Sequence, residues 1–146
     1  MTKTLAAGYS ALAAPAAAAF AAILAAIVAL DLVWLGLIAR PLYRQGIGHL
    51  ISDSPVWAAA VVFYLVYALG LLLFAVLPNA EAGWGRTASM AALFGFVAYA
   101  TYDLSNLATL KGWPLGLSLL DMAWGSALSA VSALAGRAVL LRWAPA

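Results

Sequence analysis

The sequence predicts an all-α integral membrane protein, a four-helix transmembrane bundle with short loops. Of its 146 residues, 67% are hydrophobic and 8% are charged, whereas about a quarter of a soluble domain is charged. Four long apolar runs are separated by short polar segments that contain proline or glycine. The length fits a single transmembrane domain over residues 1–146. The chain has no cysteine, which excludes disulfides and thiolate metal sites.

The first helix is predicted at about residues 15–39. Lys3 and the Ala-rich run after it resemble a signal peptide, but the apolar stretch Ala11–Ile38 exceeds the roughly 7–15 residues of a signal h-region. We therefore interpret it as a transmembrane helix. Pro15 fits the first turn, and Arg40-Pro41 is expected to end the helix because the residue before a proline disfavours helical geometry.

The connection over residues 40–54 is the longest, and its amphipathic pattern indicates that part of it lies along the membrane interface. The remaining helices are predicted at about 55–77, 87–110 and 114–134. On the last of these, the small residues Gly125, Ser129 and Ala133 recur every four positions, a pattern typical of close helix packing within one chain or between copies.

Basic residues set the expected orientation. Lys3, Arg86, Arg137 and Arg142 fall on one side, against Arg40, Arg44 and Lys111 on the other. The positive-inside rule then favours both termini in the cytoplasm. These basic residues are spread along the chain, so no nucleic-acid partner is expected.

Three acids interrupt the apolar helices and indicate where a site lies, because a charged group in hydrocarbon usually faces a partner or a cavity. Asp103 belongs to the most polar stretch of the sequence, residues 101–114, and Asp31 and Asp121 lie in apolar runs. Each is seven or eight residues from a helix end at the same predicted membrane face. At about 1.5 Å per residue, the acids share a layer roughly 10–12 Å below that face.

Other polar and aromatic side chains fall near the same layer by helical spacing or in the loops above it. The candidate ligand-binding residues are Asp31, Trp34, Arg40, Arg44, His49, Tyr64, Tyr99, Tyr102, Asp103, Asn106, Lys111, Trp113, Asp121 and Trp124. No catalytic residue is assigned. The three Asp are possible ligands of a divalent metal, but no metal site is expected, because they come from separate helices without the spaced Glu and His of known bundle sites. No cofactor is expected, because no nucleotide-binding motif occurs in the chain.

Four pieces of sequence carry a family resemblance. They are Leu30-Asp31-Leu-Val-Trp34-Leu-Gly36, then Pro41-Leu-Tyr43-Arg44 with Gly48-His49-Leu50, then the run Thr101–Pro114, and finally Asp121-Met-Ala-Trp124-Gly125. In these pieces the chain resembles the bacterial predicted membrane proteins grouped as domain of unknown function 2177. The resemblance implies a multi-pass protein of the bacterial inner (plasma) membrane with about four helices. It implies no activity.

The leading functional hypothesis is a protein that binds a lipid or small amphiphile in a one-sided polar cavity lined by Asp31, Asp103, Asn106 and Asp121. The three basic residues Arg40, Arg44 and Lys111 would hold an anionic head group at its mouth. A purely structural alternative pairs the same bases with the three acids. The partners expected are membrane lipids, a small amphiphilic ligand, and a second copy or a larger membrane complex.

Three further functional classes remain open. An intramembrane enzyme of lipid modification would use one Asp as general acid or base, so the question of enzymatic activity stays undecided. A small proton-coupled transporter would use the acids to exchange protons for a substrate. An accessory subunit of a membrane complex is the fourth alternative.

Overall fold

The computed structural model describes the backbone of residues 2–143 and the side chains of residues 13–143. Within that part, every regular element is helical, which confirms the all-α prediction. The elements in order are α1 (Thr2–Val33), the π-helical turn η1 (Trp34–Ile38), α2 (Arg40–Ile47), the 3-10 turn η2 (Gly48–Leu50), α3 (Trp57–Leu71), the π-helical turn η3 (Leu72–Val76), the 3-10 turn η4 (Leu77–Asn79), α4 (Trp84–Thr109) and α5 (Leu115–Trp143).

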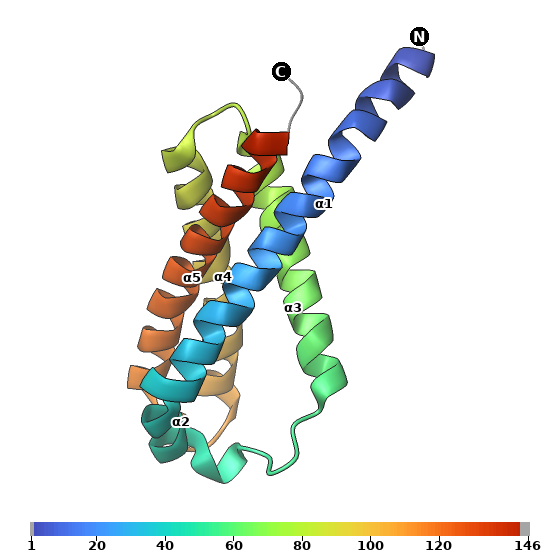
Figure 1. Ribbon diagram of the computed structural model, residues 1–146. Helices are drawn as coiled ribbons and strands as arrows, with labels where there is room; N and C mark the ends of the chain where they lie inside the picture. The colour runs from blue at the N-terminus through green and yellow to red at the C-terminus, as the bar shows by residue number, and fades with distance from the viewer. Residues whose placement is uncertain (1, 144–146) are drawn as a thin grey trace.

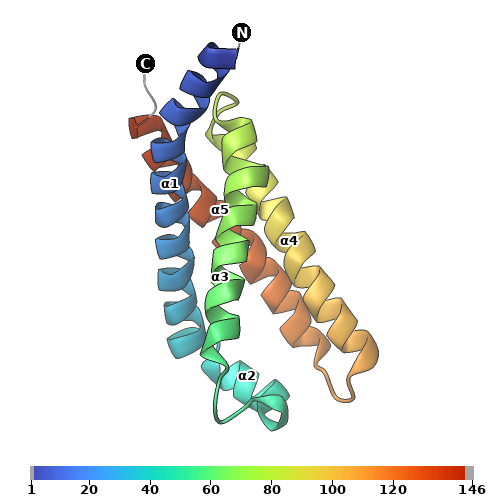
Figure 2. The same cartoon turned by 90° about the vertical axis from the view of Figure 1, so that its right-hand side faces the viewer.

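Four long helices run side by side, with the short α2 across one end (Figure 1). The same end holds the connection from α2 to α3 and the tight turn between α4 and α5 (Figures 1 and 2). Helix α5 packs along α4 and along α1, while α3 meets α4 mainly through the π-helical turn η3. The bundle is therefore tighter near the α3–α4 connection than near α2.

Three helices are long and apolar enough to cross a membrane among the described residues: Ala13–Ile38, Trp57–Asn79 and Leu115–Trp143. Helix α4 has the length, 26 residues, but more polar side chains, and it is not among them. The structure therefore supports three of the four predicted spans. Large apolar side chains also face outward, including Leu37 (76% exposed) and Phe74 (63% exposed), as expected for surfaces in contact with lipid tails.

The structure corrects the predicted elements in three places. The segment predicted as a loop over 40–54 contains α2, because Pro41 occupies its first turn, where a missing N–H costs little. Pro15 lies inside α1 rather than at its start. Helix α5 ends at Trp143 instead of about residue 134.

The extension of α5 is accompanied by the burial of a basic side chain. Arg137 is 4% exposed, and its guanidinium donates to the carbonyl oxygen of Asn79 and to Thr87 Oγ1 at 2.9 Å. It also lies 5.3 Å from the ring centroid of Trp84. These contacts bind the last two turns of α5 to the α3–α4 connection and keep the charge buried.

Glycines allow α4 and α1 to approach α5 closely. A Cβ atom on Gly95 of α4 would collide with the Gly125 carbonyl group on α5, and one on Gly136 would collide with Ile23 of α1. Ser129 and Ala133, which belong to the predicted row of small residues, are completely buried. The predicted small-residue packing thus operates within the chain.

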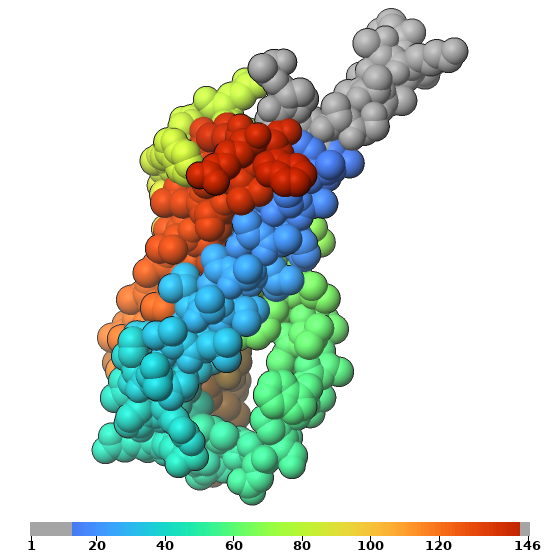
Figure 3. Space-filling model, viewed as in Figure 1, coloured from blue at the N-terminus to red at the C-terminus, as the bar shows by residue number. Residues whose placement is uncertain are grey.

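Bulky rings replace the small residues in the other half of the bundle. Phe63, Tyr64 and Tyr67 belong to α3 and line a cavity there. Helix α3 separates from α1 toward the α2–α3 connection (Figure 1). Figure 3 shows the molecular surface hollowed between α1 and α3 in this half, above the α2–α3 connection.

Candidate functional site

A cavity of about 580 Å³ occupies the half of the bundle next to α2. Two carboxylates and many aromatic rings line it, and all five α-helices contribute side chains. The lining residues are Asp31, Trp34, Leu35, Tyr43, Ala60, Phe63, Tyr64, Tyr67, Ala98, Tyr99, Tyr102, Asp121 and Trp124. We call this space the aromatic cavity.

The two carboxylates of the aromatic cavity are held by phenol and indole groups. Asp31 accepts hydrogen bonds from Tyr64 Oη and from Trp124 Nε1, both at 3.1 Å. Asp121 accepts a hydrogen bond from the Tyr43 hydroxyl. Asp31 thereby joins α1 to α3 and α5, and Asp121 joins α5 to α2. Both acids are almost fully buried, at 4% and 3% exposure.

A stacked pair of indoles forms one wall. The rings of Trp34 and Trp124 are 4.3 Å apart and 5° from parallel. Trp34 begins the π-helical turn η1, in which the Ala39 N–H donates to the Trp34 carbonyl oxygen at 2.7 Å. Such turns are frequent at functional sites, and this one precedes Pro41, which has no N–H to continue the regular ladder. The turn places an aromatic ring of the first span opposite α5.

Helix α2 supplies one of the cavity residues that the sequence-based candidates lacked, Tyr43. Tyr43 is half-buried, and α2 also packs through Ile47 against Trp113 and Leu117. Burial, and then the hydrogen bond to Asp121, raises the pKa of the Tyr43 phenol. The hydroxyl group therefore stays protonated and acts as the donor.

Half of the predicted candidates line the aromatic cavity. These are Asp31, Trp34, Tyr64, Tyr99, Tyr102, Asp121 and Trp124. The four basic candidates do not line it, and their side chains are exposed: Arg40, Arg44, His49 and Lys111. Asn106 is half-buried outside the lining.

Asp103 and Trp113 lie in a separate buried place between α4 and the start of α5. Asp103 is fully buried, and neither of its carboxylate oxygens has a hydrogen-bond partner in the described part of the chain. Trp113 donates through Nε1 to Ser118 Oγ at 3.0 Å. The predicted single cavity with all three acids is thus divided, with two acids in the aromatic cavity and the third outside it.

The lining residues missed from the sequence are Leu35, Tyr43, Ala60, Phe63, Tyr67 and Ala98. Tyr67 had a readable signal, since it lies three positions after Tyr64 and so shares its helix face. Its hydroxyl bonds to Ser129 Oγ at 2.7 Å. Tyr43 had one as well, because it belongs to a motif of the family resemblance. Ala60 and Ala98 had no signal in the sequence, because they line the cavity only through the small size of their side chains.

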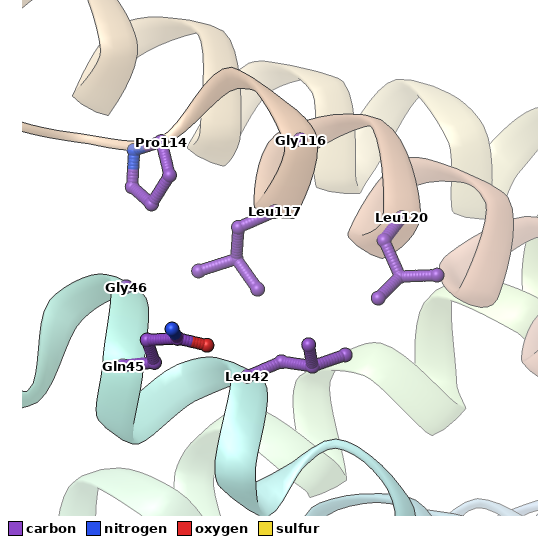
Figure 4. Close-up of a pocket in the computed structure, with 7 residues that line it drawn as sticks. All are labelled: Leu42, Gln45, Gly46, Pro114, Gly116, Leu117 and Leu120. Carbon is purple, nitrogen blue, oxygen red and sulfur yellow. The ribbon is translucent and has the colours of Figure 1, made fainter.

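Two other pockets are apolar. One, of about 330 Å³, lies between α2 and the start of α5, where Leu42, Leu117 and Leu120 face one another and Gln45 is the one polar side chain of the lining (Figure 4). The other, of about 510 Å³, is an open groove between α1 and α3, lined by residues such as Phe20 and Leu69. Neither contains an ionisable group, so the aromatic cavity is the candidate site.

Comparison with known proteins identifies the family. The model of the predicted membrane proteins DUF2177 matches residues 16–138. The chain belongs to the DUF2177 family. No curated protein and no solved structure matches it. In this DUF2177 protein, the matched range contains every residue that lines the aromatic cavity.

The donor set of the aromatic cavity does not favour a metal ion. Among the described residues, no three His, Cys, Asp or Glu side chains come close enough together to hold one. The site instead combines aromatic surface with two buried hydrogen-bond acceptors. This combination suits a small molecule that is mostly apolar and carries a polar group.

Proposed function

We propose that this protein is a multi-pass membrane protein that binds a lipid or small amphiphile in the aromatic cavity. The observation that carries the proposal is the cavity itself, about 580 Å³ with two buried carboxylates among aromatic rings. Ligand sites in proteins are commonly 300–1,000 Å³ in volume, mostly apolar, with a few placed polar groups.

An amphiphile fits because the cavity holds its carboxylates inside and mainly apolar and aromatic side chains at its rim, including Tyr102. The carboxylates of Asp31 and Asp121 are buried, whereas the rim side chains Leu35 and Phe63 are 44% and 45% exposed. The hollow between α1 and α3 gives the tail a way out toward the apolar outer faces of the helices (Figure 3). The polar group would enter first, and the tail would remain in contact with lipid.

Helix α4 is included in the proposed membrane domain as a fourth crossing. Its 26 residues span about 39 Å at 1.5 Å each, which exceeds the roughly 30 Å hydrocarbon core. Its buried acid Asp103 faces the interior rather than lipid. Four crossings would return both termini to the same side, for which the positive-inside rule favours the cytoplasm.

Binding is favoured over transport by the packing beyond the cavity. Toward the α3–α4 connection, the interior is filled by apolar side chains including Ile23, Leu71 and Val76, all fully buried. This packing closes the cavity on that side, whereas a carrier needs access from both sides. The bonds from Tyr and Trp donors position the two carboxylates and do not by themselves supply a catalytic step.

The test is native mass spectrometry of the protein extracted from its own membrane in a maltoside detergent. We expect a bound amphiphile in the unaltered protein and its loss in Ala98→Trp, which fills the aromatic cavity. Ala123→Trp is the matched control, because Ala123 is exposed on α5 and does not line the cavity. Absence of any bound molecule, or equal retention in the two variants, would contradict the proposal.

A further inference from the structure

The chemistry of the lining identifies the ligand class. We infer that the polar group bound in the aromatic cavity is an organic ammonium cation, an inference that rests on the proposed binding function. It is supported by three features of the cavity, which are its charge, the direction of its hydrogen-bond donors and its aromatic rings.

The charged side chains of the cavity have one sign. Asp31 and Asp121 line it and are nearly fully buried. The basic residues nearest in sequence, Arg40 and Arg44, have exposed side chains and do not line it. A carboxylate attracts a cation far more strongly in a low-dielectric interior than in water. The lining therefore favours a positive group and disfavours the anionic head group that the exposed bases had indicated.

Three donors of the cavity are already used. The Tyr64 hydroxyl and the Trp124 indole N–H point at Asp31, and the Tyr43 hydroxyl points at Asp121. An anion would have to take these donors from the carboxylates or use the indole N–H of Trp34, which has no hydrogen-bond partner among the described residues. In either case it would lie beside two carboxylates. Each ionised carboxylate has about four acceptor positions, so both acids keep capacity to accept from a ligand N–H or to face a quaternary nitrogen.

Aromatic faces complete the match. A cation within about 6 Å of a ring centroid is attracted by the π-electrons, and cages of Tyr and Trp bind quaternary ammonium groups in this way. The cavity has such rings on several sides, which are Trp34 of η1, Tyr64 of α3, Tyr99 of α4 and Trp124 of α5. A bare metal ion would instead require several oxygen ligands. The cavity volume of about 580 Å³ also fits an organic group rather than a bare ion.

The experiment compares three dodecyl amphiphiles with the same tail, namely dodecyltrimethylammonium, dodecyl sulfate and a neutral dodecyl polyoxyethylene ether. Each is titrated into purified protein in maltoside micelles, at fractions below that at which dodecyl sulfate unfolds the protein. Binding is followed by tryptophan fluorescence, which Trp34 and Trp124 report from the cavity wall. We expect the ammonium compound to bind at least tenfold more tightly than either of the others.

Removing one carboxylate charge tests whether the buried acids cause the ammonium preference. Asp121→Asn and Asp31→Asn are each expected to abolish the ammonium preference while retaining binding of the neutral amphiphile, which also shows that the variant is folded. Asp53→Asn carries the same charge change on an exposed residue outside the cavity and should keep the preference.

The outcomes separate the two proposals. Equal binding of the three amphiphiles, or a preference for the sulfate, overturns the ammonium assignment and leaves the binding function intact. No saturable binding of any of them overturns both. Competition by phosphatidylethanolamine, but not by phosphatidylglycerol, would identify a lipid head group as the source of the cation. Ammonium preference without such competition would identify a free amphiphilic amine.

Discussion

Replacing Gly95 by alanine should separate α4 and α5, which carry five of the thirteen residues that line the aromatic cavity. The added Cβ would lie 2.8 Å from the carbonyl carbon of Gly125 and still closer to its oxygen and to Ser129 Oγ. Real Cβ atoms do not approach that closely, and the obstacle is the backbone of α5, which has no rotamer to change. Overpacking of this kind costs about 1–3 kcal/mol, and a backbone obstacle places it near 3.

Helix propensity partly offsets that cost, because alanine is favoured over glycine in a helix by about 1 kcal/mol. The net expectation for Gly95→Ala is a loss of about 2 kcal/mol in the free energy of unfolding. Gly85→Ala, in the same helix with nothing within 4 Å of the added Cβ, should instead be neutral or stabilising by up to about 1 kcal/mol. Unfolding by sodium dodecyl sulfate in mixed micelles, followed by circular dichroism, measures both. A Gly95→Ala protein as stable as the unaltered one would refute the close α4–α5 contact.

Three other predictions concern the cavity and its surroundings. Gly125→Ala should push the Tyr99 ring, which lies against that Cβ position, into the cavity and weaken dodecyltrimethylammonium binding about tenfold in the fluorescence titration. Tyr43→Phe removes the donor to the buried acid on α5, worth about 1.5–3 kcal/mol, so α2 should become more sensitive to limited proteolysis while the long helices stay folded. Single cysteines at the exposed positions Ala82 and Lys111 should be labelled from opposite sides of the membrane, since the chain has no native cysteine; labelling from one side would show that α4 does not cross.

The helices themselves could largely be predicted from the sequence, because apolar length and proline punctuation are local signals. Helix α2 was different. Its eight residues are too few and too polar to stand out, and it exists because Ile47 packs against Trp113 and Tyr43 reaches Asp121. Those are tertiary contacts across more than sixty residues, which no local pattern reports.

Counting residues predicts a common depth for the three acids, but it could not predict the direction in which each side chain points. Tyr99 and Asp103 are four apart and share a stripe on α4, yet Tyr99 lines the aromatic cavity while Asp103 is buried outside it. Periodicity fixes which residues share a face of one helix. How that helix is rotated against its neighbours depends on where glycines let backbones meet, here at Gly95 and Gly125.

Side-chain size along the bundle explains why a cavity and a packed core coexist in one small domain. Toward the α3–α4 connection, alanine and glycine bring the helices together, and Ile23 and Leu71 fill what remains. Toward α2, aromatic rings line the space between the helices. They leave part of that space open, whereas smaller interdigitating side chains fill it in the other half. Asp31 and Asp121 fix the orientation of those rings by accepting hydrogen bonds from them, so the acids join the walls of the cavity as well as charging them. The same contacts that maintain the hollow therefore also provide the negative charge that would select its ligand.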